Sequence, residues 1–321
     1  MIELFYKNFE CSVILDNSNT SQWFPVKSGV RQGCIISPIL FLLCIDWIMK
    51  NTTADKPRGI QWTLFSQLED IDFADDLAIL STTPKQLQEK TDRLTAFSQK
   101  TGLSINANKT QVMCINPPTP AQITAEGKVL ENVQDFTYLG SIVSTDNGAY
   151  KDIKARLGKA RSTYARLKPI WKSKAYSTKS KLRLYNSLVK SVLLYSSECW
   201  RIIQSDTNKL NAFHNGCLRR ICGIYWPNVI SNADLYKRTN CQSICTEIKR
   251  RRLRWVGHVL RMENHRTPKT AIRWTPTGKR KRGRPKTTWR RTVTNELAND
   301  ISLMGHGTGH GQRPTPLESS S

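Results

Sequence analysis

The stretch that decides the fold of the first part of the chain is Ile71-Asp72-Phe73-Ala74-Asp75-Asp76-Leu77-Ala78-Ile79-Leu80. Apolar, strand-forming residues lie on both sides of two adjacent carboxylates, which predicts a β-hairpin with Asp75 and Asp76 at its tip. Two negative charges at the edge of an apolar sheet repel each other and lose hydration, so one should take up a proton unless a cation binds between them. Mg²⁺ suits such a pair together with substrate phosphates. The alternative is a turn with two solvated aspartates, which an acidic pair on its own would favour.

The charge of the chain is distributed very unevenly. The 321 residues carry a formal net charge of +24. Residues 1–150 hold 12 Lys and Arg against 16 Asp and Glu, a net of −4, whereas residues 151–321 hold 37 against 9, a net of +28. A chain of this length forms more than one domain. Its basic half predicts binding to a polyanion, which we expect to be nucleic acid.

Cysteine usage and hydropathy point to a protein that stays inside the cell. The nine cysteines lack the short, regular spacing of a secreted disulfide scaffold, and we expect Cys34, Cys44 and Cys114 to be reduced core residues. No secretory leader follows Met1. The apolar run 35–49 is too short to span a bilayer and contains an aspartate, so it predicts a buried core helix. We therefore expect a nuclear or cytoplasmic location and no membrane partner.

Residues 1–145 predict an α+β domain, with an antiparallel sheet covered by helices on one face. Glycines in the segment 29–38 permit close backbone approach, and Ser37-Pro38 predicts a helix cap followed by a first-turn proline. Thr83-Pro84 predicts a second helix start. The further predicted elements are a hairpin over 9–27, a buried helix over 39–50, a strand over 111–115, a small hairpin at 126–127 and a strand ending at 143.

The remainder of the chain predicts helices. Apolar residues recur at helical spacing between basic ones over 151–171, and amphipathic segments follow at about 178–195, 206–222 and 242–262. Tyr164, Trp171 and Trp255, interleaved with basic residues, suit stacking on nucleic-acid bases, although solvated helix faces are the simpler alternative. A final short helix contains Trp289, and residues from 305 onward predict disorder.

Several motifs, in order, give the chain a resemblance to reverse transcriptases of non-LTR (LINE-type) retrotransposons. Residues 29–41 followed by Phe73-Ala74-Asp75-Asp76 resemble the palm of that family. Residues 102–110 resemble the segment after its catalytic hairpin, and Tyr138-Leu139-Gly140-Ser141 resembles its primer grip. The segment 255–258 with the basic tail is similar to its C-terminal region. The resemblance covers about residues 1–300.

The resemblance implies an architecture and a chemistry. The architecture is a partial palm over 1–145, an all-α thumb over 146–200, a basic helical C-terminal region over 201–304, and a disordered tail over 305–321. The chemistry is RNA-directed DNA polymerisation with two Mg²⁺ or Mn²⁺ ions, which place the 3′-hydroxyl and the leaving oxygens in line. The implied partners are an RNA template, a DNA primer and deoxynucleoside triphosphates.

The same resemblance implies a role for individual residues. Asp75 would be the principal metal ligand and Asp76 its neighbour. Lys109 would be the general acid for departing pyrophosphate, although a solvated loop lysine explains it equally well. The residues expected under the incoming nucleotide and template base are Arg31, Gln32, Gly33, Ser37 and Pro38. Those expected to position the primer are Tyr138, Leu139 and Gly140.

One part of the family's pattern is missing. Its first catalytic aspartate lies on a palm strand before the equivalent of residues 9–27, and Met1 already lies beyond that strand. Asp16 and Asp46 are poor substitutes, so we expect weak metal binding and little activity without the upstream part of the polyprotein. The alternative is a non-catalytic nucleic-acid-binding protein derived from such an element, and a product that never folds stably is a third reading.

Two other constellations leave alternatives open. Cysteines spaced Cys-x4-Cys and Cys-x3-Cys, with nearby histidines, do not form a clean zinc finger, so core packing is favoured over zinc; they are Cys217, Cys222, Cys241, Cys245, His214, His258 and His265. Segment 279–286 predicts an import signal or a phosphate-binding patch, and its Arg-Gly-Arg-Pro core resembles an AT-hook for A·T-rich minor grooves. The residues expected to bind nucleic acid are Arg250, Arg251, Arg252, Arg254, Lys279, Arg280, Lys281, Arg282 and Arg284.

Overall fold

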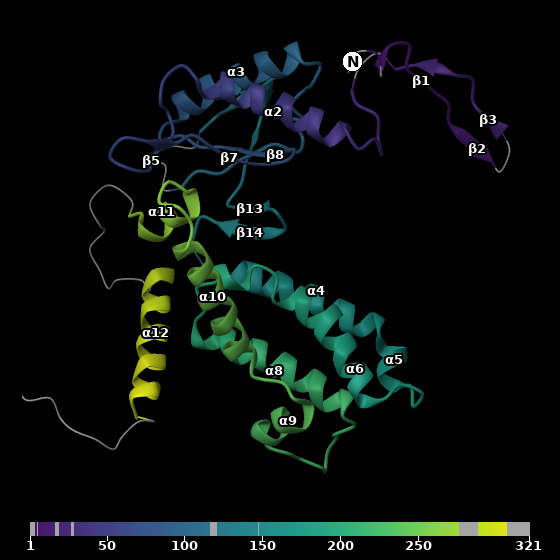
Figure 1. Cartoon of the computed structure of the whole chain (residues 1–321), viewed down its shortest axis with the longest axis vertical. Coiled ribbons are helices and arrows are strands. Elements are labelled where there is room, and N and C mark those ends of the chain that lie inside the picture. The colour runs from purple at the N-terminus through teal and green to yellow at the C-terminus, as the bar shows by residue number, and fades with distance from the viewer. Residues whose placement is uncertain are drawn as a thin grey trace, which may run out of the picture. The chain divides into compact units, whose positions relative to one another are not determined.

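The computed structural model describes residues 4, 6–16, 19–26, 29–115, 121–146, 148–275 and 288–306. The chain divides into two compact units, Met1–Phe136 and Thr137–Ser321. The boundary between these units falls inside the strand β13 (Asp135–Tyr138). Each unit is described separately below, and Figure 1 labels their elements.

Two helices form the framework of the first unit. Helix α3 (Pro84–Lys100) begins as predicted, because the Thr83 side chain accepts a hydrogen bond from the Gln86 amide and Pro84 opens the first turn. Helix α2 (Ser37–Thr53) begins differently, since Ile36 is its N-cap residue and no side chain caps it. The two helices pack against each other (Figure 1).

The strands of the first unit pair only in twos. The predicted hairpins over 9–27, over 71–80 and around 126–127 are present. The described strands of this unit form two-stranded sheets instead of one larger sheet, and all of these pairs except one are antiparallel. The pairs are β1 (Glu10–Cys11) with β4 (Phe24–Pro25), β2 (Ile14–Asp16) with β3 (Asn19–Thr20), β5 (Ile60–Gln61) with β6 (Gln67–Leu68), β7 (Asp70–Phe73) with β8 (Asp76–Ile79), β10 (Thr124–Ala125) with β11 (Lys128–Val129), and, in parallel, β9 (Gln111–Val112) with β12 (Glu131–Asn132).

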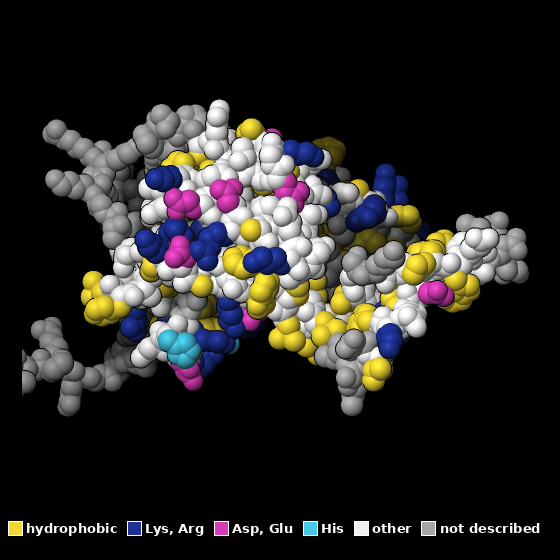
Figure 2. All heavy atoms as spheres, turned by 90° about the horizontal axis from the view of Figure 1, so that it is seen from above, with side chains coloured by type: hydrophobic (Ala, Val, Ile, Leu, Met, Phe, Trp, Pro, Cys, Tyr) yellow, Lys and Arg dark blue, Asp and Glu magenta, His cyan; other side chains and the backbone are white. Residues whose placement is uncertain are grey.

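The core of the first unit is split into two small clusters. One joins α2, β8 and α3 around Ile48 and Leu94, and the other surrounds Ile123. The helix predicted over 39–50 is present, but it is only partly buried, because Leu42 and Leu43 on α2 are 50% and 61% exposed. Figure 2 shows hydrophobic side chains open to solvent between charged ones on the face it presents. Helix α2 therefore buries only one of its apolar faces within this unit.

The second unit is helical apart from the hairpin of β13 with β14 (Ser141–Ser144). Within it, α8 packs against α4 and α10 (Figure 1). A π-helical segment, Tyr185–Lys190, connects α6 to α7. The helices are α4 (Tyr150–Arg166), α5 (Lys168–Lys172), α6 (Thr178–Leu184), α7 (Ser191–Leu193), α8 (Gln204–Ile221), α9 (Asn232–Thr239), α10 (Ile244–Leu260), α11 (Thr267–Arg273) and α12 (Trp289–His306), with a short 3₁₀ helix at Ser197–Cys199.

One continuous core holds the second unit together. It includes Leu193, Leu210 and Leu218, which are fully buried, and it extends from α4 to α10. His214 lies inside it, with Nδ1 beside the Tyr185 hydroxyl at 2.8 Å and Nε2 beside the Gln242 carbonyl at 3.1 Å. Core packing is therefore confirmed for His214 and Cys217, whereas Cys222, Cys241 and Cys245 are half-buried and His258 and His265 are exposed.

Some predictions fall outside the described residues. Lys279, Arg280, Lys281, Arg282 and Arg284 do so, as does the tail from residue 307 onward, whereas residues 305 and 306 belong to α12. All nine cysteines are described and all are free thiols, although Cys34, Cys44 and Cys114 are half-buried rather than core residues. None of the described helices has the length and apolarity needed to cross a membrane.

Candidate active site

The two adjacent carboxylates lie at the tip of the β7–β8 hairpin, as the sequence predicts. Phe73 pairs with Asp76, so Ala74 and Asp75 form a two-residue turn, and Ala74 adopts a left-handed conformation with φ +56°. Such a φ is strained for a residue other than glycine. Asp75 and Asp76 are both exposed, so the predicted loss of hydration is not present.

The donor set at this tip fits a hard divalent cation. Two neighbouring carboxylates facing solvent offer oxygen ligands, which Mg²⁺ prefers, and leave the remaining positions open to water and phosphate. Among the described residues, no cluster of three Asp, Glu, His or Cys side chains is close enough to hold a metal by itself. Asp75 and Asp76 would therefore supply only two carboxylate ligands to a metal ion.

A second acidic pair lies on the same hairpin and was missed by sequence reasoning. Asp70 and Asp72, two residues apart on β7, line a cavity of about 400 Å³ with Asp46 of α2. Desolvation, then the hydrogen bond and the charge of Asp70, raise the pKa of Asp72 to about 7. The i, i+2 spacing of Asp70 and Asp72 on a strand is the signal that would have placed them on one face.

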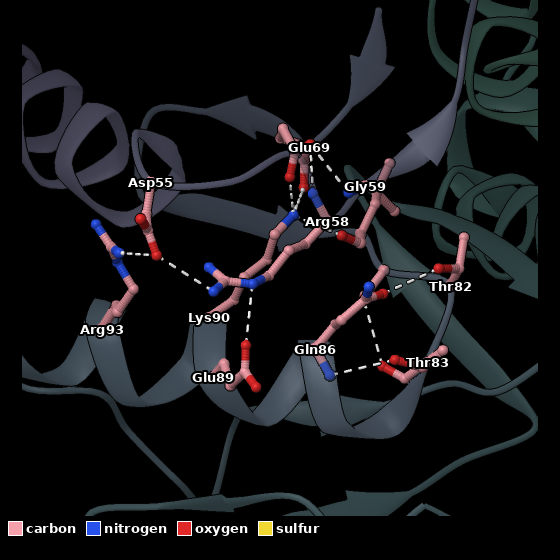
Figure 3. A network of polar contacts seen from close by, with 12 residues as sticks. Asp55, Arg58, Gly59, Glu69, Thr82, Thr83, Gln86, Glu89, Lys90 and Arg93 are labelled. Atoms are coloured by element: carbon pink, nitrogen blue, oxygen red, sulfur yellow. Dashed lines mark hydrogen bonds and ion pairs between the residues drawn. The ribbon is translucent and has the colours of Figure 1, made fainter.

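The base of the hairpin is held by a buried ion pair (Figure 3). Lys90 of α3 is 1% exposed and pairs with the Glu69 carboxylate, just before β7. Its Nζ also donates to the Leu80 carbonyl at 2.7 Å and the Glu69 carbonyl at 3.1 Å. Glu69 Oε1 accepts from the amides of Arg58 and Gly59 at 3.0 and 2.9 Å. Lys90 therefore fixes both strands at the end opposite the carboxylate tip.

More exposed charges extend this network along α3. Arg58 pairs with Glu89 at 3.0 Å and with Asp55 at 3.2 Å, and Arg93 pairs with Asp55 at 3.1 Å (Figure 3). Arg93 also donates to the Asn51 carbonyl at 2.6 Å, near the end of α2. These contacts tie the loop after α2 to α3. Neither they nor the Lys90 contacts carry a sequence motif, and so the sequence does not reveal them.

The glycine-rich segment before α2 is stabilised by its own contacts. The Arg31 guanidinium lies 4.2 Å from the centre of the Phe9 ring, and the Ser37 hydroxyl donates to the Arg31 carbonyl at 2.6 Å. Ser37 is buried, whereas Gln32, Gly33 and Pro38 are exposed. Gly33 has φ +83°, which favours glycine. Ser37 thus closes the turn instead of facing solvent as a nucleotide contact would.

Lys109 lies on an exposed turn, where its amide donates to the Asn106 carbonyl at 3.0 Å. Within the described part of the chain it forms no ion pair with Asp75 or Asp76. This position agrees with a solvated loop lysine and supplies no contact for a general acid.

The turn Tyr138-Leu139-Gly140 is braced by the helical unit. Leu139 and Gly140 have φ +48° and +78°, and both carbonyls are capped: Tyr195 Oη donates to Leu139 at 2.8 Å, and an Arg156 Nη donates to Gly140 at 2.6 Å. The Arg156 guanidinium also lies over the Tyr195 ring, 4.1 Å from its centre. The result is a fixed, solvent-facing turn on one surface of the unit.

Buried polar contacts continue from this turn into the helices. The Asp152 carboxylate accepts from the Ile142 amide at 3.1 Å and from Trp200 Nε1 at 2.7 Å, and the Trp200 carbonyl accepts from Arg252 at 2.9 Å. Arg252 also pairs with Glu296 of α12. These side chains form a chain of contacts from β14 through α4 to α10 and α12.

The arginine run of α10 is therefore divided between interior and surface. Arg252 is 1% exposed, so it is a structural residue and not the nucleic-acid contact that the sequence predicts. Arg251 is half-buried and donates to the Leu194 carbonyl at 3.1 Å. Arg250 and Arg254 are exposed. Helical periodicity accounts for this division, because neighbouring residues point 100° apart.

The aromatic residues expected to stack on bases pack against other aromatic side chains of the protein. Trp171 is 7% exposed and stacks on Tyr164 with ring centres 5.1 Å apart. Trp255 packs edge to face against Trp289, with ring centres 5.6 Å apart. Tyr225 and Trp226 are the most exposed rings described in the helical unit, at 62% and 89%, and the sequence analysis did not select them.

The hairpin that carries these carboxylates lies within a segment that matches a known family. Residues 1–143 match the family described as reverse transcriptase (RNA-dependent DNA polymerase), and residues 163–195 match a domain of unknown function, DUF6451. An uncharacterized transposon-derived protein of Caenorhabditis elegans is 24% identical over 72% of this chain and 85% of its own length. Pol polyproteins of R2 retrotransposable elements from Popillia japonica and Drosophila melanogaster are 25% and 30% identical over 63% and 39% of this chain.

Residues 1–143 thus match a reverse transcriptase domain. This match and the similarity to R2 polyproteins support a reverse transcriptase of a non-LTR element. The chain spans 35% and 11% of the length of the Popillia and Drosophila polyproteins.

Proposed function

We propose that this chain contributes to RNA-directed DNA synthesis, with Asp75 and Asp76 as its metal ligands. The observation that carries this proposal is the hairpin tip, which presents two adjacent, exposed carboxylates inside the segment that matches reverse transcriptases. The substrates would be an RNA template, a DNA primer and deoxynucleoside triphosphates. In this proposal residues 1–145 are a partial palm, 146–200 a thumb, and 201–304 a basic nucleic-acid-binding region.

The contacts around the hairpin support a role in positioning. Magnesium or manganese ions, when bound at Asp75 and Asp76, would neutralise the charge of the phosphates during nucleotidyl transfer. Lys90 holds the base of the hairpin together, because its Nζ donates hydrogen bonds to the carbonyls of Glu69, just before β7, and Leu80, just after β8. The braced turn at Leu139 and Gly140 would present a rigid backbone to the primer.

The chain by itself is proposed to have little polymerase activity. Two carboxylates hold Mg²⁺ weakly until substrate phosphates complete its coordination. A further carboxylate from another segment of the polyprotein would bridge the ions and stabilise them. The R2 polyproteins that resemble this chain are long enough to include such a segment.

Primer extension on an RNA template tests the proposal. The chain is assayed with Mg²⁺ and with Mn²⁺, alone and fused to the upstream palm segment of an R2 polyprotein. The fusion should synthesise DNA, and Asp75→Asn or Asp76→Asn should reduce its synthesis at least about a hundredfold, an effect of about 3 kcal/mol on the barrier. Asp92→Asn, an exposed carboxylate change on α3, is the matched control. A fusion that is equally active with Asp75→Asn would refute the assignment.

A second candidate is a nucleic-acid-binding protein without catalysis. The observation that favours it is the helical unit, which has its own core and exposed cations such as Arg250 and Arg254. Binding that persists in the Asp75→Asn variant, together with no synthesis by any fusion, would select this second function.

A further inference from the structure

The helical unit contains a basic pocket of about 730 Å³ between the ends of α4 and α8 and the short helices α5 and α6. Figure 1 shows α5 and α6 near one end of this unit. The cations that line the pocket are Lys168, Lys172, Lys181 and Arg220, and no carboxylate is among its described lining residues. Neighbouring positive charges repel each other, and a bound anion relieves that repulsion.

The floor of the pocket is rigid and polar. Trp171 Nε1 donates to the Tyr164 carbonyl at 2.8 Å, and Lys181 Nζ donates to the Trp171 carbonyl at 3.0 Å. The Tyr164 hydroxyl is buried and has no hydrogen-bond partner among the described residues. Burial raises the pKa of Tyr164 well above its usual value, so its hydroxyl remains a donor. A buried donor without a partner is costly unless a ligand or water meets it.

The rim of the pocket carries exposed side chains that can contact a ligand extending out of the pocket. Lys168, Lys172 and Arg220 are exposed. Gly223, with φ +69°, reverses the chain directly after α8, and this turn places Tyr225 at the pocket. An exposed ring beside three cations is the combination that takes a stacked base together with its phosphate.

We propose that this pocket binds one nucleotide of a single-stranded RNA or DNA. Lys168, Lys172 and Arg220 contact its phosphates, and Tyr225 stacks on its base. Tyr164 and Lys181 line the floor beneath the nucleotide. The volume lies within the ~300–1,000 Å³ of typical small-ligand sites. A single strand is required because a base in a duplex is already stacked on both faces. This site is independent of polymerisation.

Binding of a fluorescent single-stranded 12-mer to the full chain, measured by anisotropy over a range of salt concentrations, tests the site. Lys168→Ala with Lys172→Ala should reduce the slope of log K against log salt by about 1.4, since each phosphate contact on a single strand contributes about 0.7. Tyr225→Ala should weaken binding about tenfold, and Tyr225→Phe should preserve it. All three positions are exposed, so the variants should fold.

Matched controls separate the pocket from general surface charge. Lys174→Ala with Lys179→Ala removes the same charge from neighbouring exposed positions that do not line the pocket, and Tyr176→Ala removes an exposed ring there. If the pocket and control variants lose equal affinity, the site is refuted. Competition by duplex or by pyrophosphate as strong as by the single strand would also refute it. Photo-cross-linking of a 5-iodouracil oligonucleotide to Tyr225 provides an independent positive result.

The proposal for the pocket and the proposal for polymerase activity can be refuted independently of each other. Asp75→Asn should leave the affinity for the 12-mer unchanged, whatever its effect on synthesis. If the pocket and control variants lose equal affinity for the 12-mer while the fusion still synthesises DNA, only the pocket proposal is refuted.

Discussion

The two units of this protein differ in how completely they bury their apolar residues. Among the described residues, the helical unit has one cluster of 17 buried hydrophobic residues, whereas the first unit has two clusters, of five and four. On α2, Ile39, Leu43 and Trp47 are 57%, 61% and 44% exposed. Because the stabilisation from burial grows with the apolar area removed from water, the helical unit should be the more stable one. The unit with the carboxylate pair depends more on its polar contacts.

The largest expected effect is at the buried cation of the first unit. Lys90→Met leaves Glu69 without its buried partner, and the free energy of unfolding of this unit should fall by about 3–5 kcal/mol. Hydrogen exchange of α3 and β7 would report the loss, and the helical unit should keep its protection. Lys85→Met, an exposed change on the same helix, is the control. Equal effects of the two variants would show that the ion pair does not hold the hairpin.

Truncations in the two units should cost very different amounts. Leu210→Ala opens a cavity in the fully buried core of the helical unit and should cost about 2–5 kcal/mol. Leu42→Ala on α2 removes a side chain that is half exposed and should cost less than about 0.5 kcal/mol. Denaturant titration of both variants measures the difference. A large cost for Leu42→Ala would mean that a partner or second copy covers α2 in solution.

Acid should destabilise the helical unit through His214. Burial, then the charge of Lys190, lowers the pKa of His214 to about 4 from 6.5. Between these values the unfolded chain binds more protons, so stability is complete above pH 6.5 and falls as the pH drops towards 4, by about 3 kcal/mol at most. Urea denaturation at pH 7 and pH 4.5 should show this loss, and His214→Gln should reduce it. The same loss in both proteins would exclude His214 as its source.

The smallest effect is expected at the hairpin tip. Ala74→Gly relieves a left-handed conformation, and the free energy of unfolding should rise by up to about 1 kcal/mol, less the entropy that glycine loses on folding. Ala78→Gly in the adjoining strand is the control and should lower stability instead. A decrease for Ala74→Gly would contradict the positive φ at the turn.

Local signals explain which features were predicted correctly. The hairpin at 71–80 follows from apolar, strand-forming residues on both sides of an acidic turn, and the start of α3 follows from Thr83 and Pro84. These elements depend on residues close together in the chain. The start of α2 was mispredicted because the Ser37 hydroxyl donates to the Arg31 carbonyl and so is not the cap.

Contacts between distant residues explain the features that were missed. Lys90 and Arg252 have the sequence signature of surface cations, yet each is 1% exposed. The partners that stabilise them, Glu69 and Glu296, are 21 and 44 residues away. The basic pocket likewise combines α4, α5, α6 and the end of α8. The periodicity of a single segment does not reveal contacts between residues that are far apart in the sequence.

The sequence alone determined the carboxylate pair, the hairpin that carries it, the helical second half and the excess of positive charge, because each depends on composition or on neighbours within a few residues. Only the tertiary structure decided which cations are buried, which aromatic rings remain exposed, and that the strands pair in twos. Burial is a property of the packed chain, since it depends on which distant side chains exclude water from a group.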